Sequence, residues 1–218
     1  ALVRRVERAK YRGVLGINIG RNFDTPNEHA ARDYLYCLER VYPLASYITV
    51  NISSPNTQGL RDLQEADALR AFLATLHEAR EKLAVTHGAR KPVLLKIAPD
   101  LTEPDMDAMA KVLGESGLDG LVCTNTTVAR DAIADSPRAG EGGGLSGRPL
   151  REPADQVLRG MRRRLGDALP IIGVGGIMEG AAAPDKLDAG SHLVPLYPRL
   201  LYRRPALAAE RLHATRRP

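Results

Sequence analysis

The chain has 218 residues, of which 44% are hydrophobic and 26% charged, a composition typical of a globular protein rather than a disordered, fibrous or membrane-spanning one. Lysine and arginine total 31 against 26 acidic residues, and such a mildly basic protein suits an anionic small ligand. No aromatic-interleaved or zinc-finger pattern accompanies the basic clusters, so we favour solvated helix faces over a nucleic-acid-binding surface and expect no nucleic-acid partner.

The two cysteines, Cys37 and Cys123, lie far apart without the spacing of a disulfide framework or a zinc site, which favours a reducing compartment and no bound metal. No apolar run approaches the roughly 20 residues that span a bilayer, and residues 1–13 are typical of an amphipathic helix rather than a signal peptide. We therefore expect this chain by itself to be soluble. It begins without methionine and inside a helical pattern, a first indication that an N-terminal part is missing.

Short apolar runs rich in β-branched residues recur along the chain, and each is typical of a buried strand. They cover residues 14–20, 47–53, 92–98, 120–126, 170–176 and 192–197. The clearest helical patterns between them are residues 62–83 and 102–117, and in the second Thr102 and Asp105 have capping-box spacing. Alternating strands and helices predict an α/β fold with a parallel sheet, either an open doubly wound sheet or a barrel.

Polar residues gather at the carboxyl end of nearly every predicted strand, as Asn18, Asn51, Lys96 and Thr124 illustrate. In a (β/α)8 TIM barrel every strand contributes to this active-site rim, whereas an open sheet concentrates ligand contacts at one switch point. We therefore predict one domain over residues 1–218, built as a (β/α)8 barrel. Because only six of eight βα units are present, we expect the barrel to be incomplete, with its first two strands missing from this chain.

Lys96 lies inside an apolar strand, where a lysine is rarely tolerated unless its ammonium meets an anion or lines a site. One interpretation is a fixed positive charge beside a cofactor. The alternative is a lysine that snorkels to the rim or pairs with Asp100.

Two glycine-rich segments suit close approach of the backbone to a ligand. The first, GVGG at 173–176, follows the penultimate predicted strand, and Tyr197 ends the last one, where barrels bind phosphate through backbone N–H groups. A strand-ending turn would explain GVGG equally well. The second, GGGLSG, ends the long irregular segment 128–150, and loops of that length are usually functional or disordered.

Asn125 stands between Thr124 and Thr126, and these side chains can recognise a planar amide-and-carboxylate substrate, or alternatively form a turn and helix N-cap. In VNISSPNTQGL, Pro55 restricts Ser54 to extended geometry, so the strand ends there. A serine at that rim suits a nucleophile or a proton acceptor. The sequence lacks GxSxG, which argues against a hydrolase triad.

The segments GINIGRN, VNISSPNTQGLRDLQ, LLKIAPDLTE, VCTNTTVAR, GGLSGRPL and PIIGVGGI, in this order, resemble dihydroorotate dehydrogenases from about residue 2 to about residue 210. Serine at position 54, where the cytosolic class 1 has cysteine, indicates the quinone-dependent class 2. The resemblance implies oxidation of (S)-dihydroorotate to orotate in pyrimidine (UMP) biosynthesis. It implies FMN as the bound hydride acceptor and a membrane quinone as the final electron acceptor.

The resemblance also implies roles for individual residues. Ser54 would take the proton from C5 of the substrate while hydride leaves C6 for the flavin, and a serine needs a proton relay for this. Ser53 and Thr57 are interpreted as residues that shape the loop. Positions that match the orotate-binding residues are Asn51, Asn56, Asn125 and Thr126. Positions that match the FMN contacts are Asn18, Asn51, Lys96, Thr124 and Gly147, with Gly176 and Tyr197 at the phosphate.

The family's N-terminal third is absent from this chain, and with it the membrane-docking helices and the first barrel strand. The resemblance places the whole protein peripherally on the inner membrane, on the cytoplasmic side in a bacterium, through that segment. Pro195 and Pro198 depart from the family pattern, and Pro198 replaces a Ser/Thr whose N–H contacts the phosphate. The alternatives are an inactive partial barrel with open edges, and another FMN barrel such as a dihydrouridine synthase, against which SSPNT and TNTT argue.

Overall fold

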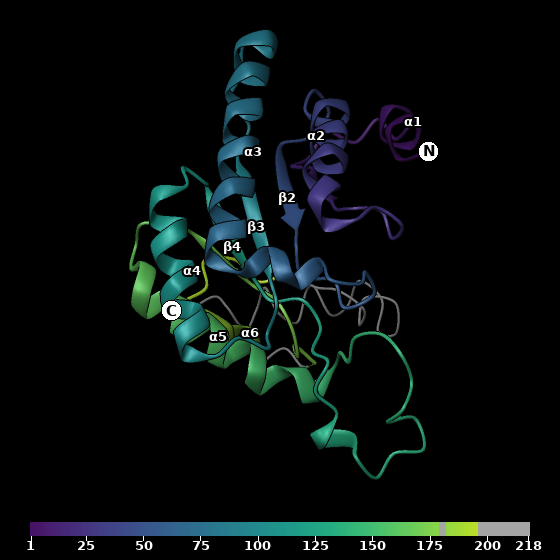
Figure 1. Cartoon of the computed structure of the whole chain (residues 1–218), viewed down its shortest axis with the longest axis vertical. Helices are drawn as coiled ribbons and strands as arrows, with labels where there is room; N and C mark the ends of the chain where they lie inside the picture. Colours follow the sequence, from purple (N-terminus) through teal and green to yellow (C-terminus); the bar gives the residue numbers. More distant parts are fainter. Residues whose placement is uncertain (179–181, 196–218) are drawn as a thin grey trace.

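The computed structural model describes residues 1–178 and 182–195, and its centre is one sheet of five parallel strands in sequence order (Figure 1). The strands are β1 (Gly16–Ile19), β2 (Tyr47–Asn51), β3 (Val93–Ile97), β4 (Gly120–Cys123) and β5 (Ile171–Gly173). The α-helices are α1 (Leu2–Arg8), α2 (Ala30–Val41), α3 (Ala66–His87), α4 (Glu103–Glu115), α5 (Arg151–Leu165) and α6 (Ala182–Asp188). The 3-10 helices are η1 (Asn27–His29), η2 (Leu60–Gln64), η3 (Asp131–Ile133) and η4 (Arg148–Leu150). Parallel strands joined by helices confirm the predicted α/β fold.

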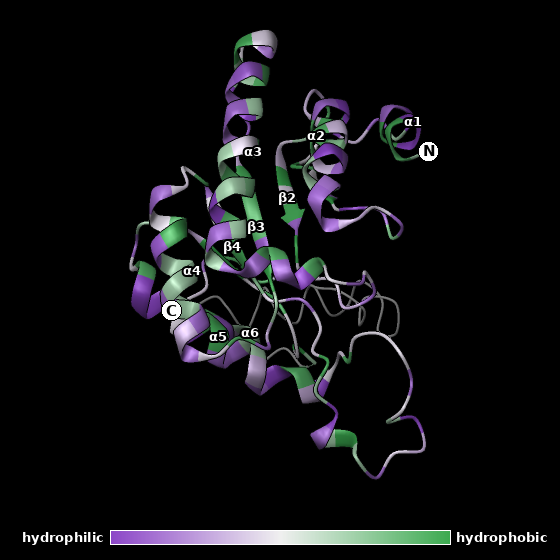
Figure 2. Ribbon diagram, in the orientation of Figure 1, coloured by the Kyte–Doolittle hydropathy of each residue, from purple (hydrophilic) through white to green (hydrophobic). Residues whose placement is uncertain are grey.

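One face of this sheet is apolar and is covered by helices. Ile48, Val50, Leu95 and Ile97 of β2 and β3 are all 0% exposed. They belong to one core with apolar side chains from α2 to α5, and Figure 2 shows hydrophobic strands beneath helices whose outer surfaces are largely hydrophilic. Because successive residues of a strand point to opposite faces, the residues between these four point away from the helices.

Local signals set the ends of two helices. Thr102 caps α4, because its hydroxyl accepts a hydrogen bond from Asp105 N at 3.3 Å while its own N–H donates to Asp105 Oδ2 at 2.9 Å. The predicted capping box is therefore confirmed. The helix expected over residues 62–83 is confirmed as α3, which ends at Gly88 with a φ of 64°. Its first predicted residues form η2 instead, because Glu65 is extended and interrupts the helical backbone.

The N-terminal helix is shorter than the expected residues 1–13. It extends over α1 alone, and none of its seven residues is buried. A helix of that length gains little stability from its own hydrogen bonds, so the pattern overestimated it. In the part of the chain that the structure describes, no helix combines the length and apolar character needed to cross a membrane.

The strand expected over residues 192–197 is reduced, within the described residues, to one parallel bridge between Leu193 and Ile172. Pro195 follows shortly after and has no N–H to donate to a longer ladder. The prediction of a regular sixth strand is therefore wrong over residues 192–195. Outside the described residues lie Tyr197 and Pro198.

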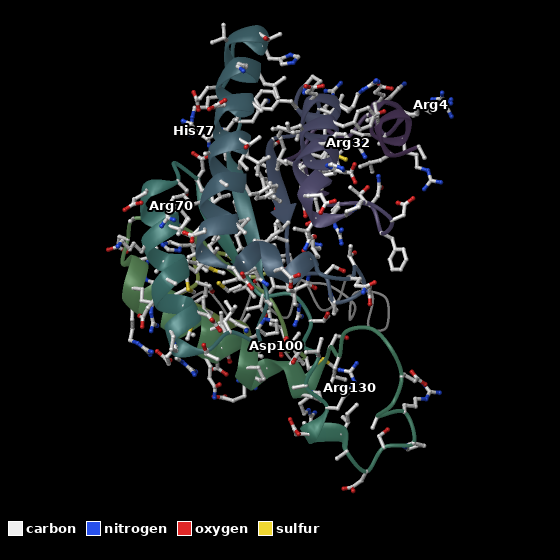
Figure 3. The ribbon with its side chains drawn as sticks, in the orientation of Figure 1. Arg4, Arg32, Arg70, His77, Asp100 and Arg130 are labelled. Carbon is white, nitrogen blue, oxygen red and sulfur yellow. The ribbon has the colours of Figure 1, made fainter. Side chains whose placement is uncertain are left out.

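The irregular segment 128–150 leaves the sheet after β4 and extends away from it as a long loop (Figure 1). An antiparallel bridge between Thr127 and Leu145 closes its base. Arg130 spans the loop, with its Nη2 donating to the carbonyl of Gly143 at 2.6 Å (Figure 3). These contacts return the glycine-rich end of the loop to the carboxyl ends of the strands.

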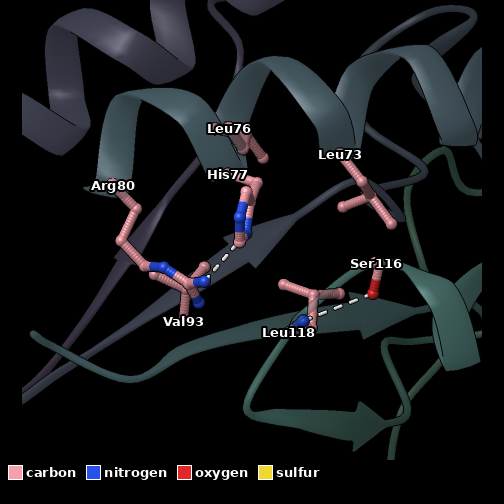
Figure 4. A pocket seen from close by; sticks show the side chains of 7 residues that line it. All are labelled: Leu73, Leu76, His77, Arg80, Val93, Ser116 and Leu118. Atoms are coloured by element: carbon pink, nitrogen blue, oxygen red, sulfur yellow. Dashed lines mark hydrogen bonds between the residues drawn. The ribbon is translucent and has the colours of Figure 1, made fainter. Parts of the chain in front are cut away.

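The amino end of the sheet is closed by a charged cluster beneath α3. The Arg80 side chain, only 3% exposed, pairs with Asp119 at 2.8 Å. It also lies 3.0 Å from His77 Nδ1, as Figure 4 shows. The cavity beside it has a volume of about 10 Å³, which is room for one water molecule at most. This cavity is therefore too small for an organic ligand.

Candidate active site at the carboxyl ends of the strands

The sheet face opposite the helices carries polar side chains near the carboxyl ends of the strands. Asn51, the last residue of β2, is the register partner of Lys96 in β3, and Asn18 in β1 is the partner of Thr49. Parallel register and strand alternation therefore place Asn51 and Lys96 side by side on one face. This is the arrangement that the rim pattern in the sequence predicted.

A cleft of about 270 Å³ opens at the carboxyl ends of β3, β4 and β5. Six residues predicted from sequence line it, namely Lys96, Thr124, Asn125, Thr126, Gly147 and Gly176. Sequence reasoning missed the apolar part of the lining, formed by Leu150, Val174, Ile177 and Met178. These residues lie in or beside the glycine-rich segments of the sequence. That position does not show whether an apolar side chain points into the cleft or into the core.

Lys96 lines the cleft with a mostly buried side chain, and burial lowers the pKa of its ammonium. No acidic side chain among the described residues forms an ion pair with it. Asp100, the partner considered from the sequence, pairs with Arg61 instead, at 2.7 Å between Nη1 of the arginine and Oδ2 of the aspartate. The alternative of a Lys96–Asp100 pair is therefore wrong, and Lys96 lies on the wall of the cleft as a cation with no acidic partner among residues 1–178 and 182–195.

The two rim asparagines contact each other directly. Asn125 Nδ2 donates to Asn51 Oδ1 at 3.0 Å and to Ser53 Oγ at 3.1 Å. Asn125 Oδ1 accepts from Thr126 N at 2.9 Å. Ser53, which is 0% exposed, also hydrogen-bonds through Oγ to the carbonyl of Lys96 at 2.8 Å. The structure thus brings residues predicted separately from three strands into one hydrogen-bonded network.

Ser54 and Asn56 lie on the loop that follows β2. Ser54 is half-buried, and its Oγ accepts a hydrogen bond from Asn56 N at 3.3 Å, while the Asn56 side chain is exposed. The end of the 128–150 loop passes over them, so that a Cβ on Gly143 would stand 3.1 Å from Asn56 Oδ1. The next residue, Gly144, has no room for a Cβ, because side chains of the rim loops occupy the space. The long loop therefore covers the Ser54 loop.

The structure treats three further predicted cofactor contacts differently. Gly176 has a φ of 68°, and a Cβ there would stand 2.3 Å from Arg151 Cα, so the turn after β5 packs directly on the start of α5. Asn18 is exposed on β1 and is outside the lining of the cleft. Tyr197 lies outside the described residues, so its place at a phosphate stays a prediction.

Neither cysteine is an activated thiol. Cys123 is fully buried at the end of β4, and burial strongly raises its pKa. Cys37 is half-buried on α2, and burial raises its pKa too. Among residues 1–178 and 182–195, no group of three or more histidine, cysteine or acidic side chains could hold a metal ion.

A parallel sheet with helices on one face and a cleft at its carboxyl ends identifies the chain as part of a (β/α)8 barrel, a fold that carries its active sites at this end of the strands. The sequence model of the dihydroorotate dehydrogenase family matches residues 2–214. The chain belongs to this family.

Relatives with this family name are similar over the whole chain. The chain is 56% identical over 218 residues to the dihydroorotate dehydrogenase (quinone) of Stenotrophomonas maltophilia strain R551-3 and covers 62% of that protein. It is 56% identical over 217 residues to that of Xanthomonas campestris pv. campestris strain B100, again covering 62%. The crystal structure of DHODH from Eimeria tenella in complex with ferulenol superposes with a TM-score of 0.86 at 37% identity, over 98% of this chain and 60% of that one. The chain thus spans less than two thirds of the length of these relatives.

Proposed function

We propose that this chain carries the cofactor- and substrate-binding part of an enzyme that oxidises (S)-dihydroorotate to orotate in pyrimidine biosynthesis. FMN is the bound hydride acceptor and a quinone the final electron acceptor. The observation that carries the proposal is the Lys96 ammonium, which lines the cleft without an acidic partner among the described residues. A cation in a partly apolar cleft is costly unless a ligand compensates it, so an anionic cofactor edge fits there.

The cleft residues fit FMN in both charge and shape. Lys96 offers the positive charge that stabilises a reduced, anionic flavin. Gly147 brings backbone to the wall with no atom within 4 Å of the place a Cβ would take, which leaves room for a flat ring. When bound, FMN supplies the two-electron acceptor that this chemistry requires. We assign the remaining cofactor contacts to Asn18, Asn51, Thr124, Gly176 and Tyr197.

Substrate and product both carry a carboxylate and have amide N–H and C=O groups on the ring, and the product orotate is planar. The rim offers matching amide and hydroxyl groups close to Lys96. We assign substrate contacts to Asn51, Asn56, Asn125 and Thr126.

Ser54 is the base that we assign to proton removal at C5. Its hydroxyl stands half-buried under the 128–150 loop and accepts from the backbone N–H of Asn56. That acceptor role leaves the hydroxyl proton free to be passed on, which a serine requires because its own basicity near neutral pH is low. Covering by the loop limits access of water to this proton transfer.

The quinone and the membrane belong to the part of the proposal that rests on relatives. The curated relatives are named dihydroorotate dehydrogenase (quinone), and we transfer quinone reduction to this protein on that basis. A peripheral membrane contact, on the cytoplasmic side of the inner membrane in a bacterium, would involve a segment that precedes these 218 residues.

The test uses the full-length gene product. We expect it to purify with FMN, and its flavin absorbance to bleach when dihydroorotate is added without oxygen and to return when a quinone is added. Ser54→Ala should slow the bleaching by about 100-fold or more while flavin stays bound. Ser116→Ala, which removes a hydroxyl beside the small cavity at the amino end, serves as the matched control and should bleach at the normal rate.

Two outcomes would overturn the proposal. A full-length protein without flavin would favour the inactive partial barrel. A flavoprotein that is reduced by another substrate, and not by dihydroorotate, would move the assignment to a different FMN barrel.

A further inference from the structure

Ser53 precedes the proposed base and has no role in the proposed chemistry. Its side chain is 0% exposed, and it is outside the lining of the cleft. Its hydroxyl nevertheless contacts three groups of the site: the carbonyl of Lys96 at 2.8 Å, Asn51 Oδ1 at 3.1 Å and Asn125 Nδ2 at 3.1 Å. A buried hydroxyl with that many partners does more than shape a loop.

Two backbone N–H groups determine which way the rim amides face. Thr126 N can only donate, so the Asn125 atom at 2.9 Å from it has to be the oxygen. Ser53 N can only donate, so the Asn51 atom at 3.3 Å from it has to be the oxygen too. Asn125 Nδ2 then faces Asn51 Oδ1 at 3.0 Å, which is a correct donor–acceptor pair. Reversing either amide would set two donors against each other.

The hydroxyl of Ser53 completes this arrangement. It accepts from Asn125 Nδ2, and its proton goes to the carbonyl of Lys96, the shorter of its two acceptor contacts, which connects the amides to β3. Both hydrogens of the Asn125 amide are then used inside the protein. The NH2 group of Asn51 has no hydrogen-bond partner among the described residues. Tyr34 fixes the same residue from behind, because its hydroxyl donates to the Asn51 carbonyl at 2.6 Å.

We infer that Ser53 is a positioning residue that fixes Asn51 with its NH2 group free for the ligand. The inference rests on the proposed function and deepens it, because it states which partner donates and which accepts in one substrate contact. Asn51 presents two donors, so the ligand group that it meets is an acceptor, a carbonyl or carboxylate oxygen, and not an N–H. Asn125 holds Asn51 through Nδ2, so the substrate contact that we assign to Asn125 is left to its Oδ1.

Ser53→Ala removes the acceptor for one hydrogen of Asn125 Nδ2 and the donor to the Lys96 carbonyl. We expect the dissociation constant of orotate, measured from the change in flavin absorbance of the full-length gene product, to rise about 10-fold, the cost of about one hydrogen bond. Flavin content should stay at the normal level. Ser46→Ala is the matched control, because the Ser46 hydroxyl accepts from Leu15 N at 2.9 Å at the amino end of the sheet, far from the cleft. It should leave orotate affinity within about twofold.

A second measurement needs no variant. In the full-length protein without orotate, the side-chain NH2 protons of Asn125 should exchange slowly with solvent, and those of Asn51 quickly, as followed by NMR of asparagine-labelled protein. Adding orotate should protect the Asn51 protons. The opposite pattern, or an orotate affinity of Ser53→Ala equal to that of Ser46→Ala, would overturn the role of Ser53.

The proposed function and this inference fail in different ways. If the protein does not bind orotate at all, the proposed substrate is wrong, yet slow exchange at Asn125 would still support the amide arrangement. If orotate binds normally and the Asn125 protons exchange quickly, the proposed substrate is supported and the positioning role of Ser53 is wrong.

Discussion

Arg61 and Asp100 form an ion pair, 2.7 Å between Nη1 and Oδ2, that connects the loops after β2 and β3. The same guanidinium donates through Nη2 to the carbonyl of Thr126 at 2.9 Å, and through Nε to that of Ser53 at 3.3 Å. Asp100 also accepts from the hydroxyl of Thr127. The rim segments that carry the candidate substrate contacts are therefore held together by one arginine that lies outside the cleft lining.

Arg61→Met should destabilise the protein by about 2 kcal/mol, because it removes charge-assisted hydrogen bonds and leaves Asp100 without its cation. Arg70→Met is the control, since Arg70 pairs with Asp67 at a similar 2.8 Å but on the exposed surface of α3 (Figure 3). It should change stability by no more than about 0.5 kcal/mol. Urea unfolding of both variants gives the comparison, and equal losses would contradict a special role for Arg61.

Lys96 predicts a pH dependence of stability with a definite sign. Burial lowers its pKa in the folded, ligand-free protein, so the unfolded chain binds this proton more tightly. The free-energy cost of burying the charged lysine in the folded protein is fully present below the lowered pKa. It is lost as pH rises through that pKa towards the ordinary value of 10.5, so this contribution makes the ligand-free protein more stable with rising pH in that window.

Lys96→Met should abolish this pH dependence and raise the melting temperature of the flavin-free protein at neutral pH, while lowering flavin affinity by about 100-fold or more. Lys111→Met, which removes an exposed lysine of α4, should leave both properties unchanged. Thermal melts over a range of pH, with and without FMN, check the prediction. If Lys96→Met leaves the flavin affinity unchanged, the cofactor role of Lys96 is wrong, and the proposed function loses its main support.

The fold was predictable from sequence to the extent that it depends on local patterns. Capping at Thr102 and the apolar runs of the five strands are properties of neighbouring residues, and those elements were predicted correctly. The reduced sixth strand, by contrast, depends on how far the backbone before Pro195 can pair with β5. That pairing is a property of the tertiary structure.

The candidate site shows the same division. A lysine in an apolar strand and an asparagine at a strand end are visible in the sequence, and Lys96 and Asn51 are indeed neighbours. Ser53 was interpreted only as a loop-shaping residue, and the contacts of Ser53 and Arg61 were missed because serine and arginine are ordinary in polar loops. Their partners lie up to 72 residues away. Ser53 had one usable signal, since it stands two residues after Asn51 and side chains two apart on a strand share a face.

Lys186 and Asp155 form a buried ion pair between α6 and α5, 2.5 Å from Nζ to Oδ1, with side chains 1% and 4% exposed. Burial lowers the pKa of Lys186, which is the sign of a cation that depends on its partner. Lys186→Met should therefore cost about 3–5 kcal/mol, because the buried carboxylate loses its close cation and keeps, among the described residues, Arg151 at 3.9 Å. The double variant Lys186→Met with Asp155→Leu should recover most of that loss in urea unfolding. A double variant as unstable as the single one would show that packing, rather than charge, matters at this position.

Gly176→Ala tests the close packing beneath the glycine-rich turn. The residue has a φ of 68°, and an added Cβ would stand 2.3 Å from Arg151 Cα and 2.6 Å from Arg151 N, atoms of the backbone that cannot move aside cheaply. We expect a loss of about 2–4 kcal/mol in unfolding free energy from strain and overpacking together, and weaker FMN binding because the turn lines the cleft. Gly114→Ala is the matched control, since Gly114 lies within α4 with nothing within 4 Å of its would-be Cβ. That change should stabilise the protein by up to about 1 kcal/mol through helix propensity, so the two alanine substitutions should shift the unfolding midpoint in opposite directions.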